Sequence, residues 1–179
     1  MHKIKGEIMT AEPPDKGTLD ASEATYLLEM PKKLKSPQVA YLDRKFTLDI
    51  ESIDGKEEFI VDVGNYSITI KYKNQLRCRS NMPLLRLDVG TGWHRNPNVR
   101  ISCNPTDPFF DVHDDCIGRY YEPGEPHIHF YREGFDDKWA YPIPSCFKNL
   151  DDKMGTLMEF LKKCNVDGRP TIQRGLYDD

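Results

Sequence analysis

Residues 126–144 read PHIHFYREGFDDKWAYPIP and contain two segments from which the fold can be built outward. Polar and apolar residues alternate along HIHFYRE, a period of two that is typical of a half-buried strand. The turn-forming letters GFDD separate this segment from KWAYPI, which predicts a second strand. The stretch therefore predicts an antiparallel hairpin. It also raises the question of what His127 and His129, which share one face of the first strand, do there.

Residues 45–90 predict further strands of the same sheet. Phe46, Leu48 and Ile50 alternate with polar residues, and Asp54-Gly55 is a strong hairpin signal. Strand-like segments follow at short spacing, at 58–64, 66–73 and 83–90. We predict an α+β fold with a central antiparallel sheet of four or more strands.

Helices are expected before and after the strands of this sheet in the sequence. Residues 18–35 predict a short helix that Asp20 or Ser22 caps and Pro31 ends. Residues 151–165 predict a second helix, with an acidic first turn and a basic last turn that suit the helix dipole. We expect both helices on one face of the sheet. Residues 1–18 are expected to form a flexible lead, and 19–179 a single domain with a long loop at about 91–125.

The composition predicts a soluble protein of one domain. The chain has 179 residues, 38% of them hydrophobic, and a net charge of -4. No apolar run approaches the roughly 18 residues that cross a bilayer, and the N-terminus lacks the apolar segment of a secretory signal. The charge is uneven, because seven basic residues and one acid, Asp88, lie between Tyr66 and Arg100. This stretch either attracts phosphate or keeps exposed strands soluble.

The candidate site follows from strand alternation. In LLRLDVG, residues 84–90, Arg86 and Asp88 share one face, and Leu85, Leu87 and Val89 share the other. If the apolar residues of this strand and of HIHFY pack against the helices, the polar ones meet on the opposite side of the sheet. The predicted cluster consists of Arg86, Asp88, His127, His129 and Tyr131, with His94 at its rim.

One interpretation of this cluster is acid–base chemistry on RNA without a cofactor. His127 and His129 would transfer the protons, because the pKa of histidine lies near neutrality. Asp88 and Tyr131 would orient the two rings. The phosphate would be bound and its charge stabilised by basic side chains, for which the candidates are Arg86, Arg132, Arg79 and Lys73.

Three other interpretations stay open. His127 and His129 would bind a divalent metal, with Asp88 or His94 as a third ligand. HIHFY also resembles the start of the histidine-triad motif of nucleotidyl transferases, although Tyr131 stands where the last histidine belongs. The two histidines would otherwise be ordinary residues of a solvated sheet face. DVHDDC, residues 111–116, is either a separate metal clip or a solvated acidic loop.

The combination LLRLDVG, HRNP and PHIHFYREGFDDKWAYPI resembles an uncharacterised family of small bacterial and phage proteins. In that family an LLRLD strand precedes His-x-Asn-Pro-Asp-Gly, and a Pro-His-x-His-x-Tyr-Arg-Glu-Gly segment precedes a Trp-Ala strand. The resemblance runs from about residue 20 to 165. Asn98-Val99 stands where the family has Asp-Gly, and the segment 101–125 looks longer than usual.

The resemblance implies no established activity. The family is similar, more loosely, to toxin-like proteins with Arg-x-Asp and His-x-His signatures. Its setting in prophages and mobile elements implies a counter-defence role, with RNA or a CRISPR ribonucleoprotein as partner. Our leading prediction is a cytoplasmic, nuclease-like protein that acts on RNA. The alternatives are a non-catalytic inhibitor, which would bind a host or CRISPR effector through its acidic loop and tail, and a metal-dependent hydrolase.

The five cysteines generate the first testable prediction. They lie at positions 78, 103, 116, 146 and 164, an odd number without any CxxC pair. This excludes a complete disulfide framework and speaks against a zinc site made of cysteine alone. We expect reduced thiols. Thiol titration of the denatured, unreduced protein should return all five, and a value of three or one would show that the protein matures in an oxidising compartment.

Overall fold

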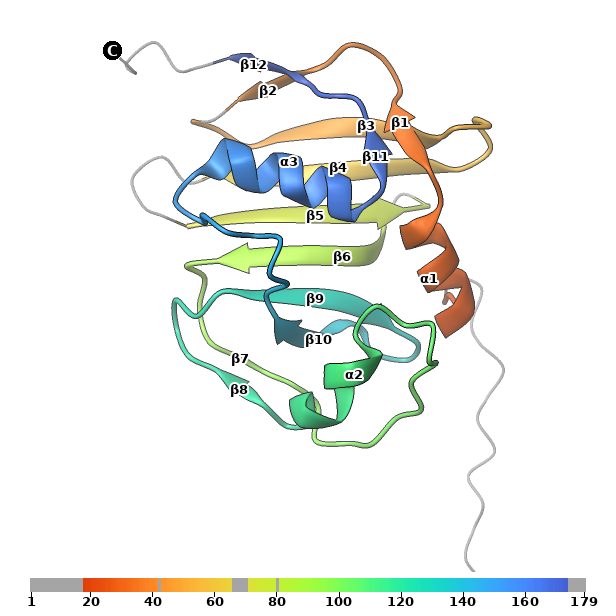
Figure 1. Ribbon diagram of the computed structural model, residues 1–179, viewed down its shortest axis with the longest axis vertical. Helices are drawn as coiled ribbons and strands as arrows, with labels where there is room; N and C mark the ends of the chain where they lie inside the picture. Colours follow the sequence, from red (N-terminus) through yellow and green to blue (C-terminus); the bar gives the residue numbers. More distant parts are fainter. Residues whose placement is uncertain (1–17, 42, 66–70, 80, 174–179) are drawn as a thin grey trace, which may run out of the picture.

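The computed structural model describes residues 18–41, 43–65, 71–79 and 81–173, so nearly all of the expected flexible lead lies outside the described residues. Figure 1 shows a central sheet of eight strands in the order β10-β9-β6-β5-β4-β3-β1-β11. All neighbours in this sheet are antiparallel except β1 and β11, which are parallel. The predicted α+β fold with a central, mainly antiparallel sheet is confirmed.

The strands of the central sheet have the following bounds: β1 (Lys32–Leu34), β3 (Phe46–Ser52), β4 (Glu58–Asn65), β5 (Tyr72–Cys78), β6 (Met82–Val89), β9 (His127–Arg132), β10 (Asp136–Pro142) and β11 (Val166–Asp167). Two small sheets accompany it. One pairs β2 (Val39–Tyr41) with β12 (Thr171–Gln173), and the other pairs β7 (His94–Arg95) with β8 (Tyr120–Tyr121).

Two sequence expectations differ from the structure. The strand expected at 66–73 is found at Tyr72–Cys78, and residues 66–70 lie outside the described part of the chain. The long loop expected at about 91–125 contains β7, β8, the short helix α2 (Phe110–His113) and the 3-10 helix η1 (Asp114–Cys116). None of these elements exceeds four residues, and helices this short have no amphipathic period from which they could be predicted.

The two longer helices lie at different places around the sheet. Helix α1 (Ala21–Glu29) begins at Asp20, whose carboxylate accepts from the Glu23 amide. Helix α3 (Lys153–Lys163) begins at Asp152, which caps it in the same way. Figure 1 shows α3 in front of the middle strands, whereas α1 lies beside the strand ends near β6 and β9. No helix among the described residues is both long and apolar enough to span a membrane.

The two faces of the sheet differ in polarity, as the alternation predicts. The hydroxyl of Tyr72 donates to the carbonyl of Leu150, just before α3, so α3 covers the face that Tyr72 belongs to. On this face, the β6 and β9 side chains Leu85, Leu87, Val89, Ile128 and Phe130 are all buried. The opposite face carries the polar residues of the same strands.

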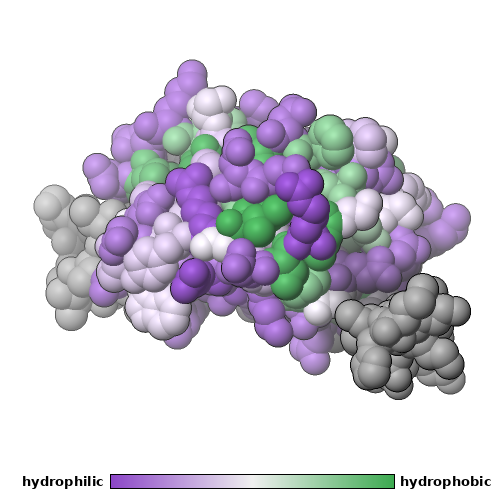
Figure 2. Space-filling model, turned by 90° about the horizontal axis from the view of Figure 1, so that it is seen from below, coloured by the Kyte–Doolittle hydropathy of each residue, from purple (hydrophilic) through white to green (hydrophobic). Residues whose placement is uncertain are grey.

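The segment between β7 and β8 forms the lower end of the molecule. Figure 2 shows this end, where hydrophobic side chains gather at the centre and hydrophilic ones surround them. Val99, Phe110 and Val112 belong to this segment and are 43%, 43% and 37% exposed. The segment therefore presents apolar surface to solvent.

Lys32 joins the ends of both long helices to the sheet. Its ammonium is fully buried and donates to the carbonyls of Leu28 and Met30 at the end of α1, and to the carbonyl of Cys164 at the end of α3. Helix ends leave carbonyls without partners and carry partial negative charge, which a cation satisfies. Burial nevertheless lowers the pKa of Lys32 to about 8.

We predict that Lys32→Met lowers the free energy of unfolding by about 3 kcal/mol, because three buried carbonyls lose their shared donor. Chemical denaturation measures this difference. The neighbouring Lys33→Met is the matched control, since Lys33 is exposed and pairs only with Glu51; it should change stability by less than about 0.5 kcal/mol. Equal effects of the two substitutions would contradict the role given to Lys32.

Candidate functional site

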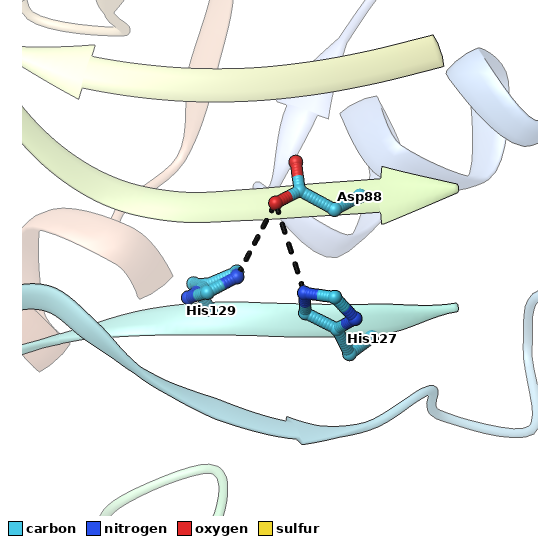
Figure 3. A group of neighbouring side chains, drawn as sticks. All are labelled: Asp88, His127 and His129. Carbon is cyan, nitrogen blue, oxygen red and sulfur yellow. Dashed lines mark ion pairs between the residues drawn. The ribbon is translucent and has the colours of Figure 1, made fainter. Parts of the chain in front are cut away.

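The pairing of β6 with β9 brings the predicted cluster together. Asp88 lies opposite His127, and Arg86 lies opposite His129. All four side chains project to the face that α3 does not cover, because strand partners share a face. Figure 3 shows the carboxylate of Asp88 above the two imidazole rings. One carboxylate oxygen, Oδ2, lies 3.3 Å from Nε2 of His129 and 3.8 Å from Nε2 of His127.

Backbone carbonyls orient both imidazole rings. Nδ1 of His127 donates to the carbonyl of Glu125, and Nδ1 of His129 donates to the carbonyl of Asp137, each at 2.8 Å. A carbonyl only accepts, so each Nδ1 carries a proton. A neutral ring therefore presents the lone pair of Nε2 toward Asp88.

Arg86 completes the cluster. Its Nε donates to Asp88 at 3.1 Å, its Nη1 to the carboxylate of Asp137, and its Nη2 to Nε2 of His129 at 2.8 Å. Burial lowers the pKa of His129 to about 4, so its ring is neutral at physiological pH. Burial alone would raise the pKa of Asp88, but the positive charge of Arg86 opposes this effect, and the pKa stays below its ordinary value.

The small sheet β7–β8 covers the histidines. The ring of His94 lies 4.6 Å from that of His129, and the ring of Tyr121 lies 4.8 Å from that of His127, measured between centroids. His127 and His129 are consequently 1% and 0% exposed. The alternative that the two histidines lie on a solvated sheet face is wrong, because the small sheet covers this part of the face.

Asn96 holds this cover in place. Its side-chain amide donates to the carbonyls of Cys116 and Ala140, and its Oδ1 accepts from the Ala140 amide. Oδ1 also lies 2.9 Å from Nε2 of His94. One buried side chain thus joins β7, the end of η1 and β10 directly above the histidines.

Several predicted site residues lie outside the cluster. The hydroxyl of Tyr131 bonds with the amide and carbonyl of Leu19, at the start of α1. Arg132 is on the opposite face, buried in a two-point ion pair with Asp107. Arg79, at the end of β5, pairs with Glu23 of α1. These three side chains stabilise the fold and do not reach the histidines.

The basic stretch is largely neutralised within the fold. Besides Arg79 and Arg86, Arg77 pairs with Asp62 on the neighbouring strand, and Arg100 pairs with Asp114. Of the predicted phosphate-binding residues, Lys73 remains beside the cluster, because it lies opposite Asp88 in the pairing of β5 with β6.

Asp137 is a member of the site that the sequence did not indicate. The pairing of β9 with β10 slips between Asp136 and Trp139, and Asp136 has a positive φ of 50°. This bulge turns the Asp137 carbonyl toward His129 and its carboxylate toward Arg86. The sequence GFDD predicts a turn, but it does not indicate whether Asp136 or Asp137 reaches the site.

The donor set fits a metal ion. Within the described part of the chain, Asp88, His127 and His129 are the only group of three His, Cys, Asp or Glu residues whose ligand atoms converge, all within 4.8 Å of one another. His94 is not part of this group. The alternative clip at 111–116 does not form, since Nδ1 of His113 lies 2.9 Å from the Tyr141 hydroxyl in the interior while Asp114 and Asp115 are exposed.

Fold and site together define a small α+β protein with a buried cluster of two histidines, an aspartate and an arginine. The chain belongs to a family of unknown function, DUF6978, whose sequence profile matches residues 19–166. This confirms the predicted membership of an uncharacterised family. No curated protein and no solved structure matches the chain significantly.

We predict that Asn96→Ala lowers the free energy of unfolding by about 3 kcal/mol, because buried backbone groups of Ala140 and Cys116 lose their partners. The cover over the histidines should loosen, so that diethyl pyrocarbonate modifies them faster. Asn98→Ala, an exposed change in the same segment, is the control. An unchanged modification rate in Asn96→Ala would mean that Asn96 does not hold the cover.

Proposed function

We propose that this protein is a metal-dependent hydrolase of phosphate esters, with one divalent ion bound by Asp88, His127 and His129. The carrying observation is that one ligand atom of each of these three side chains lies within 4.8 Å of the other two. Two histidines and one carboxylate form a common donor set for catalytic zinc and iron, and they leave coordination positions open for water and substrate.

The distances support a single ion. With metal–ligand bonds of about 2.1 Å, ligand atoms lie about 3.0 Å apart at octahedral angles and about 3.4 Å apart at tetrahedral ones. The two distances from Asp88 Oδ2, 3.3 Å and 3.8 Å, are close to these values. Small side-chain shifts bring all three atoms into contact with one ion.

Two further features are typical of metal ligands. Ligating histidines donate their second ring N–H to a carbonyl or carboxylate, which holds the ring in place, and His127 and His129 both do this. Asp88 is 7% exposed, and its second oxygen, Oδ1, has no hydrogen-bond partner within the described residues. A buried, unpaired carboxylate oxygen is costly, so Asp88 keeps one oxygen available to a further ligand besides the oxygen that faces the histidines.

Arg86 competes with the ion for one lone pair. Its Nη2 donates to Nε2 of His129, so ion binding exchanges this hydrogen bond for a metal bond. The guanidinium keeps Asp88 and Asp137 as partners, and Nη2 becomes free to donate to an oxygen on the open side of the ion. One arginine and two carboxylates carry a formal charge of -1, which a divalent ion turns to +1, and this favours an anionic substrate.

The chemistry that this arrangement supports is hydrolysis by a metal-bound water. Asp88, His127 and His129 would hold the ion, which would supply a water acidic enough to react near neutral pH. The water oxygen would form a bond to phosphorus as the phosphorus–oxygen bond to the alcohol breaks, and its proton would pass to solvent. The alkoxide takes a proton from water, and Arg86 stabilises the negative charge that builds on the phosphoryl oxygens.

The metal-free ribonuclease predicted from the sequence has less support. A general acid or base must exchange a proton with its substrate, but Nε2 of His129 already accepts from Arg86, and Nδ1 of both rings donates to a backbone carbonyl. One observation favours the inhibitor alternative, namely the exposed apolar side chains of Phe110 and Val112 at the lower end of the molecule. The counter-defence setting rests on the sequence resemblance alone.

We predict that the protein binds one Zn²⁺, Mn²⁺ or Fe²⁺ per chain, measured by calorimetry and by metal analysis after gel filtration. His129→Ala and the isosteric Asp88→Asn should each lower the affinity by at least about 100-fold, because they remove a direct ligand. EDTA should lower the melting temperature and abolish hydrolysis of a chromogenic phosphate ester.

His94→Gln is the matched control, because His94 touches the cluster but is not a ligand, and it should retain metal affinity. Melting temperatures of the metal-free variants show whether each is folded. The proposal fails if the wild-type protein binds none of the three ions, or if His129→Ala and Asp88→Asn bind them as tightly as the wild type.

A further inference from the structure

Two rows of side chains run across the uncovered face of the sheet and meet the histidine cluster. Strand pairing places successive partners side by side, about 4.8 Å apart. One row consists of Thr47, Asp62, Gln75, Arg86 and His129. The next consists of Gly64, Lys73, Asp88 and His127. The candidate metal site is therefore one end of a continuous polar track.

A groove lies at the other end of this track. Its volume is about 490 Å³, and it is lined by Lys45, Phe46, Thr47, Asp62, Val63, Gly64, Lys73 and Gln75. It lies on the face opposite α3, because Lys73 points away from the face of Tyr72. The adjoining Arg86 side chain is 18% exposed, so part of the cluster reaches solvent.

The groove favours an anion. Lys73 supplies a positive charge, and Thr47 and Gln75 supply neutral hydrogen-bonding groups. The one acid in the lining, Asp62, is neutralised by two hydrogen bonds from Arg77. Because Lys73 lies directly opposite Asp88, its charge is one strand away from the proposed ion.

Gly64 keeps the centre of the groove empty. Its φ lies outside the left-handed region, so the backbone does not require glycine at this position. A Cβ added here would meet nothing closer than 3.7 Å, which is ordinary contact. Glycine weakens a strand, and within one it often marks a place where a ligand approaches the backbone.

We infer that this groove is the substrate-binding site of the proposed hydrolase and that its ligand is a small, polar phosphate monoester such as a sugar phosphate. The inference rests on the proposed function. The phosphate lies between the ion, Arg86 and Lys73, and the polar body lies over Gly64 between Thr47 and Gln75. The groove lies one or two strand spacings from β6, roughly 5–10 Å. This distance matches the length of a five-carbon sugar phosphate.

The test compares ribose 5-phosphate with inorganic phosphate, both titrated calorimetrically into the metal-loaded protein. The wild type should bind ribose 5-phosphate more tightly. In Gly64→Leu the new side chain fills the groove, so the affinity for ribose 5-phosphate should fall about tenfold, to that of inorganic phosphate. Metal affinity and the affinity for inorganic phosphate should not change, and Gly64→Ala, which fills less of the groove, should lower the affinity for ribose 5-phosphate less than Gly64→Leu does.

A second pair of variants tests the charge. Lys73→Gln should weaken binding of both phosphate ligands roughly tenfold, because it removes a charge-assisted hydrogen bond. Lys56→Gln makes the same change in charge at the distant β3–β4 turn, where Lys56 pairs with Asp54, and should have no effect.

The outcomes separate the two proposals. If neither wild type nor Gly64→Leu binds metal, the hydrolase proposal itself is wrong. If both bind metal but ribose 5-phosphate binds equally to both, the groove is not the substrate site. If single-stranded RNA binds in place of the sugar phosphate, the groove holds a nucleic acid and the monoester inference is overturned.

Discussion

The register between β6 and β9 is the constraint on which the candidate site depends. It sets Asp88 against His127 and Arg86 against His129 on one face, with Leu85 and Leu87 of β6 and Ile128 of β9 on the other. A shift of one residue would turn the polar set into the core and the apolar set into solvent. Burial of the apolar face therefore determines, at the same time, that the polar side chains meet.

A cluster buried this deeply has to satisfy its own charges. Arg86 lies between Asp88 and Asp137, and the two histidines are held by backbone carbonyls. Breaking one partner of such a network leaves an unpaired buried charge, which is strongly destabilising. The unpaired oxygen of Asp88 is the exception. The other oxygen of Asp88 faces both histidines, and the convergence of these three side chains turns a structural network into a candidate binding site.

Much of this arrangement was predictable from the sequence, and the errors have physical causes. The period of two along HIHFY and LLRLDVG correctly placed Asp88, His127, His129 and Arg86 together. Tyr131 belongs to the same face by alternation, yet it lies near the end of β9. There Leu19, just before α1, provides the partners of its hydroxyl. Arg132 alternates with the histidines along β9, so it projects to the other face, as the alternation itself indicates.

The sequence by itself determined the α+β class, the strands that carry the site and the face on which its polar residues lie, because side-chain alternation is a local property of an extended chain. Only the tertiary structure decided that β7 and β8 cover the histidines, that the bulge in β10 turns Asp137 inward, and that a groove adjoins Arg86. These depend on contacts between residues far apart in the chain. No local pattern encodes which distant segment supplies a partner.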